Sequence, residues 1–158
     1  MFRVIGFCMC LGVYVFGTVA AGAAPDRELS LNGPWSFFLC KEETSGPQKT
    51  FFQPGFDVSK WSTISVPSTW EMQGFEEPRY NEPSRSVGLY RREFTLPAAW
   101  RDRHVVLRFE GVLYGFECWV NGQRAGSHES AYTPIQFDIT PLVKFDAANL
   151  LAVRVYKP

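Results

Sequence analysis

Residues 116–126 read Phe-Glu-Cys-Trp-Val-Asn-Gly-Gln-Arg-Ala-Gly, and this stretch is the strongest indication of the fold class. The pair Asn121-Gly122 stands between two short runs that are typical of strands. Both central residues of a two-residue hairpin turn adopt positive φ angles, which Asn and Gly tolerate best. Alternate side chains of a strand face opposite sides, so Phe116, Cys118 and Val120 share one face. The stretch therefore predicts a β-hairpin that contributes an apolar face to a sheet.

The same period of two extends outward in both directions from this hairpin. Strand-like segments occupy residues 35–39, 89–96, 105–109, 135–139 and 150–156. Val105, Leu107 and Phe109 fall on one face, and we expect these segments to form the centre of two packed sheets. Helix is confined to single turns, one at 56–61 and one at 140–144 with Thr140 as N-cap and Pro141 at the first helical position. The pattern predicts an all-β antiparallel sandwich or jelly roll.

Length and composition limit the classes of function. The chain has 158 residues, which fits one domain of roughly 100–200 residues. Its 16 basic and 16 acidic side chains balance, so it lacks the basic face that a nucleic-acid binder needs. The two histidines, His104 and His128, lie far apart in sequence, which argues against a histidine-rich metal site. No metal and no cofactor is expected in this chain.

Residues 1–23 have the pattern of a secretory signal peptide. Arg3 gives a short positive start, an uncharged and mostly apolar stretch follows, and Ala21-Gly22-Ala23 offers a small-residue cleavage pattern. The alternative is an uncleaved membrane anchor formed by residues 4–24. We expect export to the periplasm or the medium, with residues 24–158 forming the domain and no membrane association after cleavage. Cleavage would leave Cys40 and Cys118, which we expect to be buried thiols, a disulfide between them being the alternative.

Residues that could carry chemistry gather in loops. A glycosidase needs two carboxylates flanking one bond, and no strand here bears two acidic residues on one face. The adjacent pair Glu76-Glu77 is expected to be solvated. Trp70, Phe75 and Tyr80 lie near Arg79 and Asn81, and aromatic faces with polar partners suit a sugar. The alternative is that the large aromatic side chains pack at the edge of the sandwich.

Several blocks, in order, resemble the N-terminal domain of family-2 glycoside hydrolases of the β-galactosidase type. They are Leu31-Asn-Gly-Pro-Trp-Ser-Phe37, Phe52-Gln-Pro-Gly-Phe-Asp-Val-Ser-Lys-Trp61, Val66-Pro-Ser-Thr-Trp-Glu-Met-Gln-Gly74, Val87-Gly-Leu-Tyr-Arg-Arg-Glu-Phe94, the run Phe109 to Gly122, Phe137-Asp-Ile-Thr-Pro-Leu142 and Asn149-Leu-Leu-Ala-Val-Arg-Val155. The resemblance covers residues 29–156. Two departures are Thr69, where family members usually have Asn, and a shorter loop at 81–87.

The resemblance implies a jelly-roll sugar-binding domain that precedes an immunoglobulin-like domain and a catalytic barrel. It implies that the two catalytic glutamates lie in that barrel, so no catalytic residue is expected here, and that the jelly roll ends before its closing strands. It assigns a pocket-edge role to Asn81, with Tyr80 and Arg79 as neighbours. The expected partners are a β-galactoside or related glycan and the other domains of the same enzyme. The alternatives are a free-standing carbohydrate-binding module or lectin, or a structural domain that touches no sugar.

The leader pattern predicts cleavage after Ala23. Mass spectrometry of the exported protein should find residue 24 at the amino terminus, because the peptidase cuts after small residues. An intact Met1 on exported protein would contradict this. Retention in the membrane fraction would favour the anchor.

Overall fold

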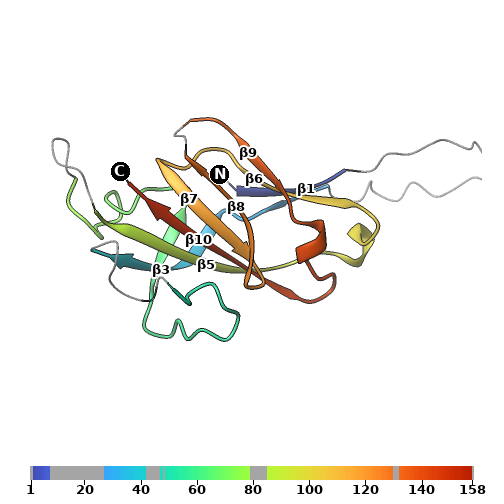
Figure 1. Ribbon diagram of the computed structural model, residues 1–158, viewed down its shortest axis with the longest axis horizontal. Helices are drawn as coiled ribbons and strands as arrows, with labels where there is room; N and C mark the ends of the chain where they lie inside the picture. Colours follow the sequence, from blue (N-terminus) through green and yellow to red (C-terminus); the bar gives the residue numbers. More distant parts are fainter. Residues whose placement is uncertain are drawn as a thin grey trace, which may run out of the picture.

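The computed structural model describes the backbone of residues 2–7 and all atoms of residues 27–41, 47, 49–78, 85–129 and 132–157. These residues form two antiparallel sheets, so the predicted all-β sandwich is confirmed (Figure 1). The larger sheet has the order β4(Ser62–Val66), β3(Gly33–Cys40), β5(Val87–Thr95), β10(Ala148–Tyr156), β7(Gly115–Val120), β8(Gln123–Glu129). The smaller sheet has the order β2(Glu28–Ser30), β1(Phe2–Phe7), β6(His104–Phe109), β9(Ile135–Asp138). No helix in the described part of the chain has the length and apolarity to cross a membrane.

The predicted strand segments all lie in strands, and the predicted hairpin joins β7 to β8. Asn121 and Gly122 both adopt positive φ angles, 53° and 83°, as a turn of this kind requires. Three strands differ from expectation. The strands β2 and β4 have no counterpart in the sequence prediction, and β1 falls within the predicted signal peptide, whose removal stays a prediction.

The main core lies between the two sheets. Val105, Leu107 and Phe109 from β6 are fully buried, and they face Phe116 and other large side chains of the larger sheet. The ring centroids of Phe109 and Phe116 lie 4.5 Å apart. The faces predicted from alternation are therefore those that the structure buries.

A second apolar cluster covers the opposite face of the larger sheet. The segment 49–61 crosses that face and places Phe51 and Phe52 against Trp119, with the Phe52 and Trp119 rings stacked at 4.8 Å. Leu89 and Ala152, from the central strands, are completely buried beneath it. The central strands β5 and β10 are thus buried on both faces.

Arg91 fixes this covering segment to the sheet. The residue is 6% exposed, and its guanidinium donates hydrogen bonds to the carbonyl oxygens of Phe51, Gln53 and Pro54. Burial lowers the pKa of Arg91, and the nearby Glu93 carboxylate acts in the opposite direction. A buried cation held by backbone carbonyls satisfies polar groups that the irregular segment would otherwise leave without partners.

Both predictions for the helical turns need correction. Residues 56–61 contain a single hydrogen-bonded turn and no helix, with the Trp61 N–H donating to the Val58 carbonyl at 2.9 Å. The Asp57 carboxylate accepts the Ser59 N–H at 2.8 Å at the start of that turn. The turn at 140–144 exists as the 3₁₀ helix η2(Thr140–Leu142), but its N-cap is Ile139. The Thr140 hydroxyl instead accepts the Val105 N–H at 2.8 Å and so ties the turn to β6.

Cys40 and Cys118 are buried thiols and form no disulfide, as expected. Cys40 lies in the outer cluster and Cys118 in the main core, so the larger sheet separates them. Burial raises the pKa of Cys118 to about 12.

Asn149 and Asn121 hold the hairpin turn, the segment after η2 and β10 together. Asn149 is 1% exposed, and its side-chain oxygen accepts hydrogen bonds from Asn121 Nδ2 and from the Lys144 N–H. Its amide nitrogen donates to the carbonyls of Lys144 and Ala147. Asn121 in turn accepts the Leu150 N–H at 2.9 Å. The buried Asn149 side chain therefore satisfies polar groups of two segments, the hairpin turn and residues 144–147, and Asn121 extends the network to β10.

Replacing that side chain should be costly. Asn149→Leu keeps the branching and the number of side-chain heavy atoms but removes every hydrogen bond of the buried amide, at a cost of about 3 kcal/mol or more in the free energy of unfolding. Urea unfolding measures the loss. The control Gln136→Leu changes an exposed amide on β9 and should stay within roughly 0.5 kcal/mol of the parent. Equal stability of the two variants would contradict the role assigned to Asn149.

Candidate functional site

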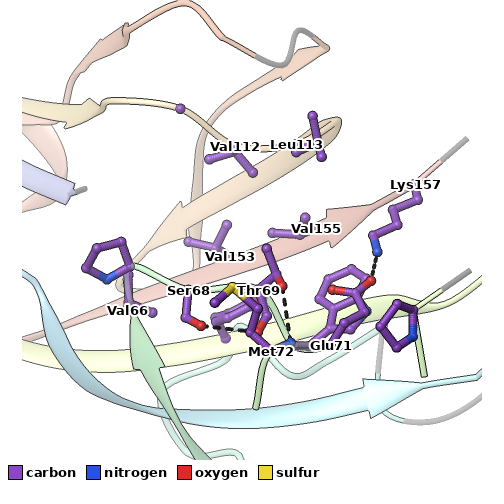
Figure 2. A pocket seen from close by; sticks show the side chains of 15 residues that line it. Val66, Ser68, Thr69, Glu71, Met72, Val112, Leu113, Val153, Val155 and Lys157 are labelled. Carbon is purple, nitrogen blue, oxygen red and sulfur yellow. Dashed lines mark hydrogen bonds and ion pairs between the residues drawn. The ribbon is translucent and has the colours of Figure 1, made fainter. Parts of the chain in front are cut away.

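An apolar groove of about 470 Å³ opens at one end of the larger sheet. One wall is the loop from Val66 to Met72, and the other is the loop 111–113 that precedes β7. Figure 2 shows Val112 and Leu113 facing the side chains of the first loop, with Val153 and Val155 of β10 between them. The groove therefore joins two loops far apart in sequence over the floor of the central strands.

Trp70 anchors the first wall. Its ring is 2% exposed and stacks with Phe37 at a centroid distance of 6.4 Å. A Cβ atom at Gly88 would come within 2.8 Å of the Trp70 ring, so the indole packs directly on the β5 backbone. Trp70 therefore packs at the edge of the sandwich, which was the alternative to an exposed aromatic face for a sugar.

Glu76 has a structural role in this wall and is not the freely solvated carboxylate expected from sequence. One carboxylate oxygen accepts the Trp70 Nε1–H at 3.0 Å, and the other accepts the Ser86 hydroxyl at 2.7 Å. Ser86 directly precedes β5 and is 3% exposed. These two bonds bring the ends of the stretch 77–85 together beside the groove, and Pro78 lines it.

The three candidate sugar-contact residues lie within that stretch. Arg79, Tyr80 and Asn81 are outside the described residues, so their role stays a prediction. The structure describes both ends of the loop that carries them. The segment therefore leaves from the groove wall at Pro78 and returns at Ser86.

An ion pair spans the open end of the groove. Lys157 Nζ pairs with the Glu71 carboxylate and lies 4.4 Å from the centroid of the Trp70 ring (Figure 2). The Lys157 and Glu71 side chains are 21% and 14% exposed. Burial lowers the pKa of Lys157. A cation over an indole face gains from the ring quadrupole as well as from its carboxylate partner.

These groups limit what the groove can do chemically. Glu71 is the one carboxylate among the described residues that line it, and it is already paired with Lys157. Hydrolysis of a glycoside requires two carboxyl groups on either side of the bond, which this lining does not provide. The groove instead offers apolar walls, the exposed Ser68 and Thr69 hydroxyls and a rim on which Met72 is 82% exposed. Such a surface suits binding rather than catalysis.

Gln73 secures the neighbouring edge of the larger sheet. Its side-chain oxygen accepts the Ser65 N–H at 3.0 Å, and its amide nitrogen donates to the Ser65 carbonyl at 2.8 Å. Gln73 lies in the turn that follows Trp70, and Ser65 lies on β4. The first wall is therefore fixed to the sheet by hydrogen bonds as well as by aromatic packing.

The structure is a jelly-roll-type antiparallel sandwich with an apolar groove at one end, and comparison with known proteins identifies its family. The family described as "Glycosyl hydrolases family 2, sugar binding domain" matches residues 29–158. The chain belongs to this family.

Relatives with assigned activities are much longer than this chain. The β-galactosidase of Priestia megaterium is 38% identical over 146 residues, which cover 81% of this chain and 14% of that protein. The β-galactosidase large subunit of Latilactobacillus sakei is 34% identical over 160 residues, covering 82% of this chain and 25% of that protein. The chain thus spans about one seventh to one quarter of the length of these relatives.

Solved structures give the same answer for the fold. A β-glucuronidase from Bacteroides uniformis matches with a TM-score of 0.66 and 33% identity, covering 81% of this chain and 14% of that one. A β-glucuronidase from Ruminococcus gnavus matches with a TM-score of 0.67 and 26% identity, covering 81% and 21%. Both support the assignment of this chain to the sugar-binding part of family-2 glycosidases.

The groove ion pair should contribute measurably to stability. A double-mutant cycle with Glu71→Gln and Lys157→Met should give a coupling energy of about 0.5–3 kcal/mol, because contacting and largely buried groups are not additive. The matched control is the exposed pair Arg101–Asp146, at 3.7 Å with side chains 63% and 57% exposed. Its coupling should lie within about 0–1 kcal/mol. Urea unfolding measures both cycles. A coupling energy of the groove pair no larger than that of the control pair would contradict the predicted contribution to stability.

Proposed function

We propose that this chain is the N-terminal, non-catalytic sugar-binding domain of an exported family-2 glycosidase that acts on β-galactosides. The observation that carries the proposal is the groove whose wall leads directly into residues 79–81. In this arrangement the domain contributes binding contacts at the edge of a substrate site. The bond is cleaved by glutamates in another domain of the full-length enzyme.

The loop geometry supports a binding role for Asn81. Glu76 holds both ends of the stretch 77–85 beside the groove, through Trp70 Nε1 and the Ser86 hydroxyl. A loop fixed at its base can present a polar side chain with little loss of conformational entropy on binding. An amide at position 81 offers a donor and an acceptor to sugar hydroxyls.

A β-galactoside is the first choice of substrate because the two relatives compared above are β-galactosidases. A β-glucuronide is the second candidate, since the similar solved structures are β-glucuronidases. A glucuronide carries a carboxylate, so its recognition calls for a cation near the site. Arg79 is the candidate residue for that contact. Comparing hydrolysis of the two glycosides by the full-length enzyme distinguishes them.

Export forms part of the proposal and rests on the leader pattern of residues 1–23. The two buried thiols are compatible with either side of a membrane, because neither depends on a disulfide. Fractionation of cells that produce the full-length enzyme tests this part separately from activity.

The isolated chain should not hydrolyse glycosides. Purified protein incubated with chromogenic β-galactosides and β-glucuronides should release no chromophore above the uncatalysed rate, because the described residues that line the groove include a single carboxylate, Glu71. The full-length enzyme is the positive control. Turnover by the isolated chain that Glu71→Gln abolishes would contradict a non-catalytic role.

In the full-length enzyme, Asn81→Ala should raise KM roughly five- to tenfold, the loss expected for about one hydrogen bond of 1 kcal/mol or slightly more. Steady-state kinetics on a β-galactoside measure this change. The control Gln136→Ala alters an amide on the exposed face of β9 and should leave KM unchanged. An unchanged KM for Asn81→Ala would remove this residue from the site.

A further inference from the structure

A second cavity, of about 400 Å³, lies on the face of the larger sheet that is turned away from the groove. Tyr90 and Val153 line the groove, whereas Arg91, Glu93 and Leu150 line this cavity. Alternate side chains of a strand face opposite sides, so the two sites lie on opposite faces of β5 and β10. They share no lining residue. We call the second site the outer cavity, and its other lining residues are Pro34, Ser36, Val58 and Arg92.

The outer cavity forms where β3 separates from β5. Their pairing ends with Ser36 opposite Arg91, although both strands continue beyond this pair. Past that point the Arg92 side chain bridges the two strands, because its Nη1 donates to the Pro34 carbonyl at 3.1 Å. Val58, from the segment that covers this face of the sheet, supplies another wall. The opening is therefore built into the sheet itself.

Three polar side chains of the outer cavity have hydrogen-bonding capacity to offer a ligand. The guanidinium of the half-buried Arg92 carries more N–H donors than its bond to Pro34 uses. Glu93 is exposed, and no described residue donates a hydrogen bond to its carboxylate. The hydroxyl of Ser36 can both donate and accept. The cavity thus presents donors, acceptors and a hydroxyl side by side.

The charges of the outer cavity favour a neutral ligand. The guanidinium of Arg91 is already directed at three backbone carbonyls of the covering segment, which solvate its charge. Arg92 and Glu93 then remain as one cation and one anion. Glu93 repels an anionic ligand and Arg92 repels a cationic one, whereas a neutral molecule with both donors and acceptors satisfies both residues.

We propose that the outer cavity is a second carbohydrate site, which binds the ring of a neutral pyranoside through adjacent hydroxyl groups. A hydroxyl is both donor and acceptor, so one sugar hydroxyl accepts from Arg92 while its neighbour donates to Glu93. Pro34, Val58 and Leu150 offer apolar contacts to the C–H faces of the ring. The cavity volume of about 400 Å³ falls within the range of roughly 300–1,000 Å³ that is typical of small-molecule sites.

This inference goes beyond the role proposed for Asn81 and does not rest on it. The outer cavity and the groove are on opposite faces of the same sheet, so they contact different parts of a glycan. Two linked points of attachment raise the avidity for a long or branched glycan without any new contact at either point.

Titration of the isotopically labelled full chain with methyl β-D-galactopyranoside tests the outer cavity. Amide chemical shifts in NMR spectra report which residues the sugar contacts. We expect saturable shifts at Ser36, Val58 and Glu93, with a dissociation constant on the order of 1 mM for so small a ligand. Absence of saturable shifts at these residues would overturn the proposal.

Two variants test the polar contacts. Glu93→Gln removes the charge of the acceptor while keeping its shape, and Arg92→Gln removes the guanidinium donors. Each should raise the dissociation constant at least about fivefold. The matched control Arg101→Gln changes a guanidinium whose side chain is 63% exposed, in the loop between β5 and β6, and should leave the dissociation constant unchanged. Because Glu93 is exposed, Glu93→Gln should keep the fold, and undiminished binding by this variant would refute the site.

Two further probes test the class of ligand. The compound 2-methoxytetrahydropyran keeps the ring but lacks the ring hydroxyls, so it should bind at least tenfold more weakly than the galactoside. Sodium sulfate should not displace the galactoside, because Glu93 repels an anion. Equal binding of the ether, or displacement by sulfate, would overturn the assignment to a neutral sugar. The titration measures neither hydrolysis nor contacts at the groove, so a failed Asn81→Ala test with intact binding here would count against the proposed function alone.

Discussion

The structure depends on the pairing of β5 with β10, because both faces of this pair carry apolar side chains. The two strands pair in register from Ala148 opposite Thr95 to Tyr156 opposite Val87. Tyr90 and Phe94 lie in the core between the sheets, whereas Leu89 and Ala152 lie in the outer cluster. An antiparallel sheet usually buries one face against other elements and exposes the other to solvent, but the larger sheet here buries apolar side chains on both faces. The aromatic segment 49–61 and the Arg91 contacts meet that need, and the groove forms where the two central strands end.

The fold could be predicted from sequence because its signals are local. Alternation and the Asn121-Gly122 turn depend on neighbouring residues, and the structure confirms the strands and buried faces that they indicated. The strand β4 was missed, although Ile64 and Val66 alternate with small polar residues in the expected way. Its outer positions are serine and threonine, and the run is short. At 56–61, where a helical turn was predicted, the structure has one hydrogen-bonded turn and no helix, and the Asp57 carboxylate binds the local backbone.

The site was less predictable because it is built from distant residues. Sequence pointed to the loop region after Trp70, where Pro78 lines the groove and Glu76 bonds the Trp70 indole in its wall. The contact of Lys157 with Glu71 joins residues that are 86 positions apart, so no local pattern could show it. Val112 and Leu113 line the opposite wall because the strand order brings their loop beside residues 66–72, which no local pattern could show. Glu76 shows most plainly why sequence alone could not predict the site. Its role depends on the position of the Trp70 indole, to which it is hydrogen-bonded.

The side chain of Gln73 has a consequence for the solubility of the protein. An outer strand of a sheet presents unpaired backbone groups that can recruit a strand from another molecule and start aggregation. On β4, Gln73 occupies both the N–H and the carbonyl of Ser65, as an incoming strand would. The Gln73 amide therefore blocks these two backbone groups of the edge strand from pairing with a strand of a neighbouring molecule. The same turn that builds the groove wall thus closes one position of the sheet edge to pairing with another strand.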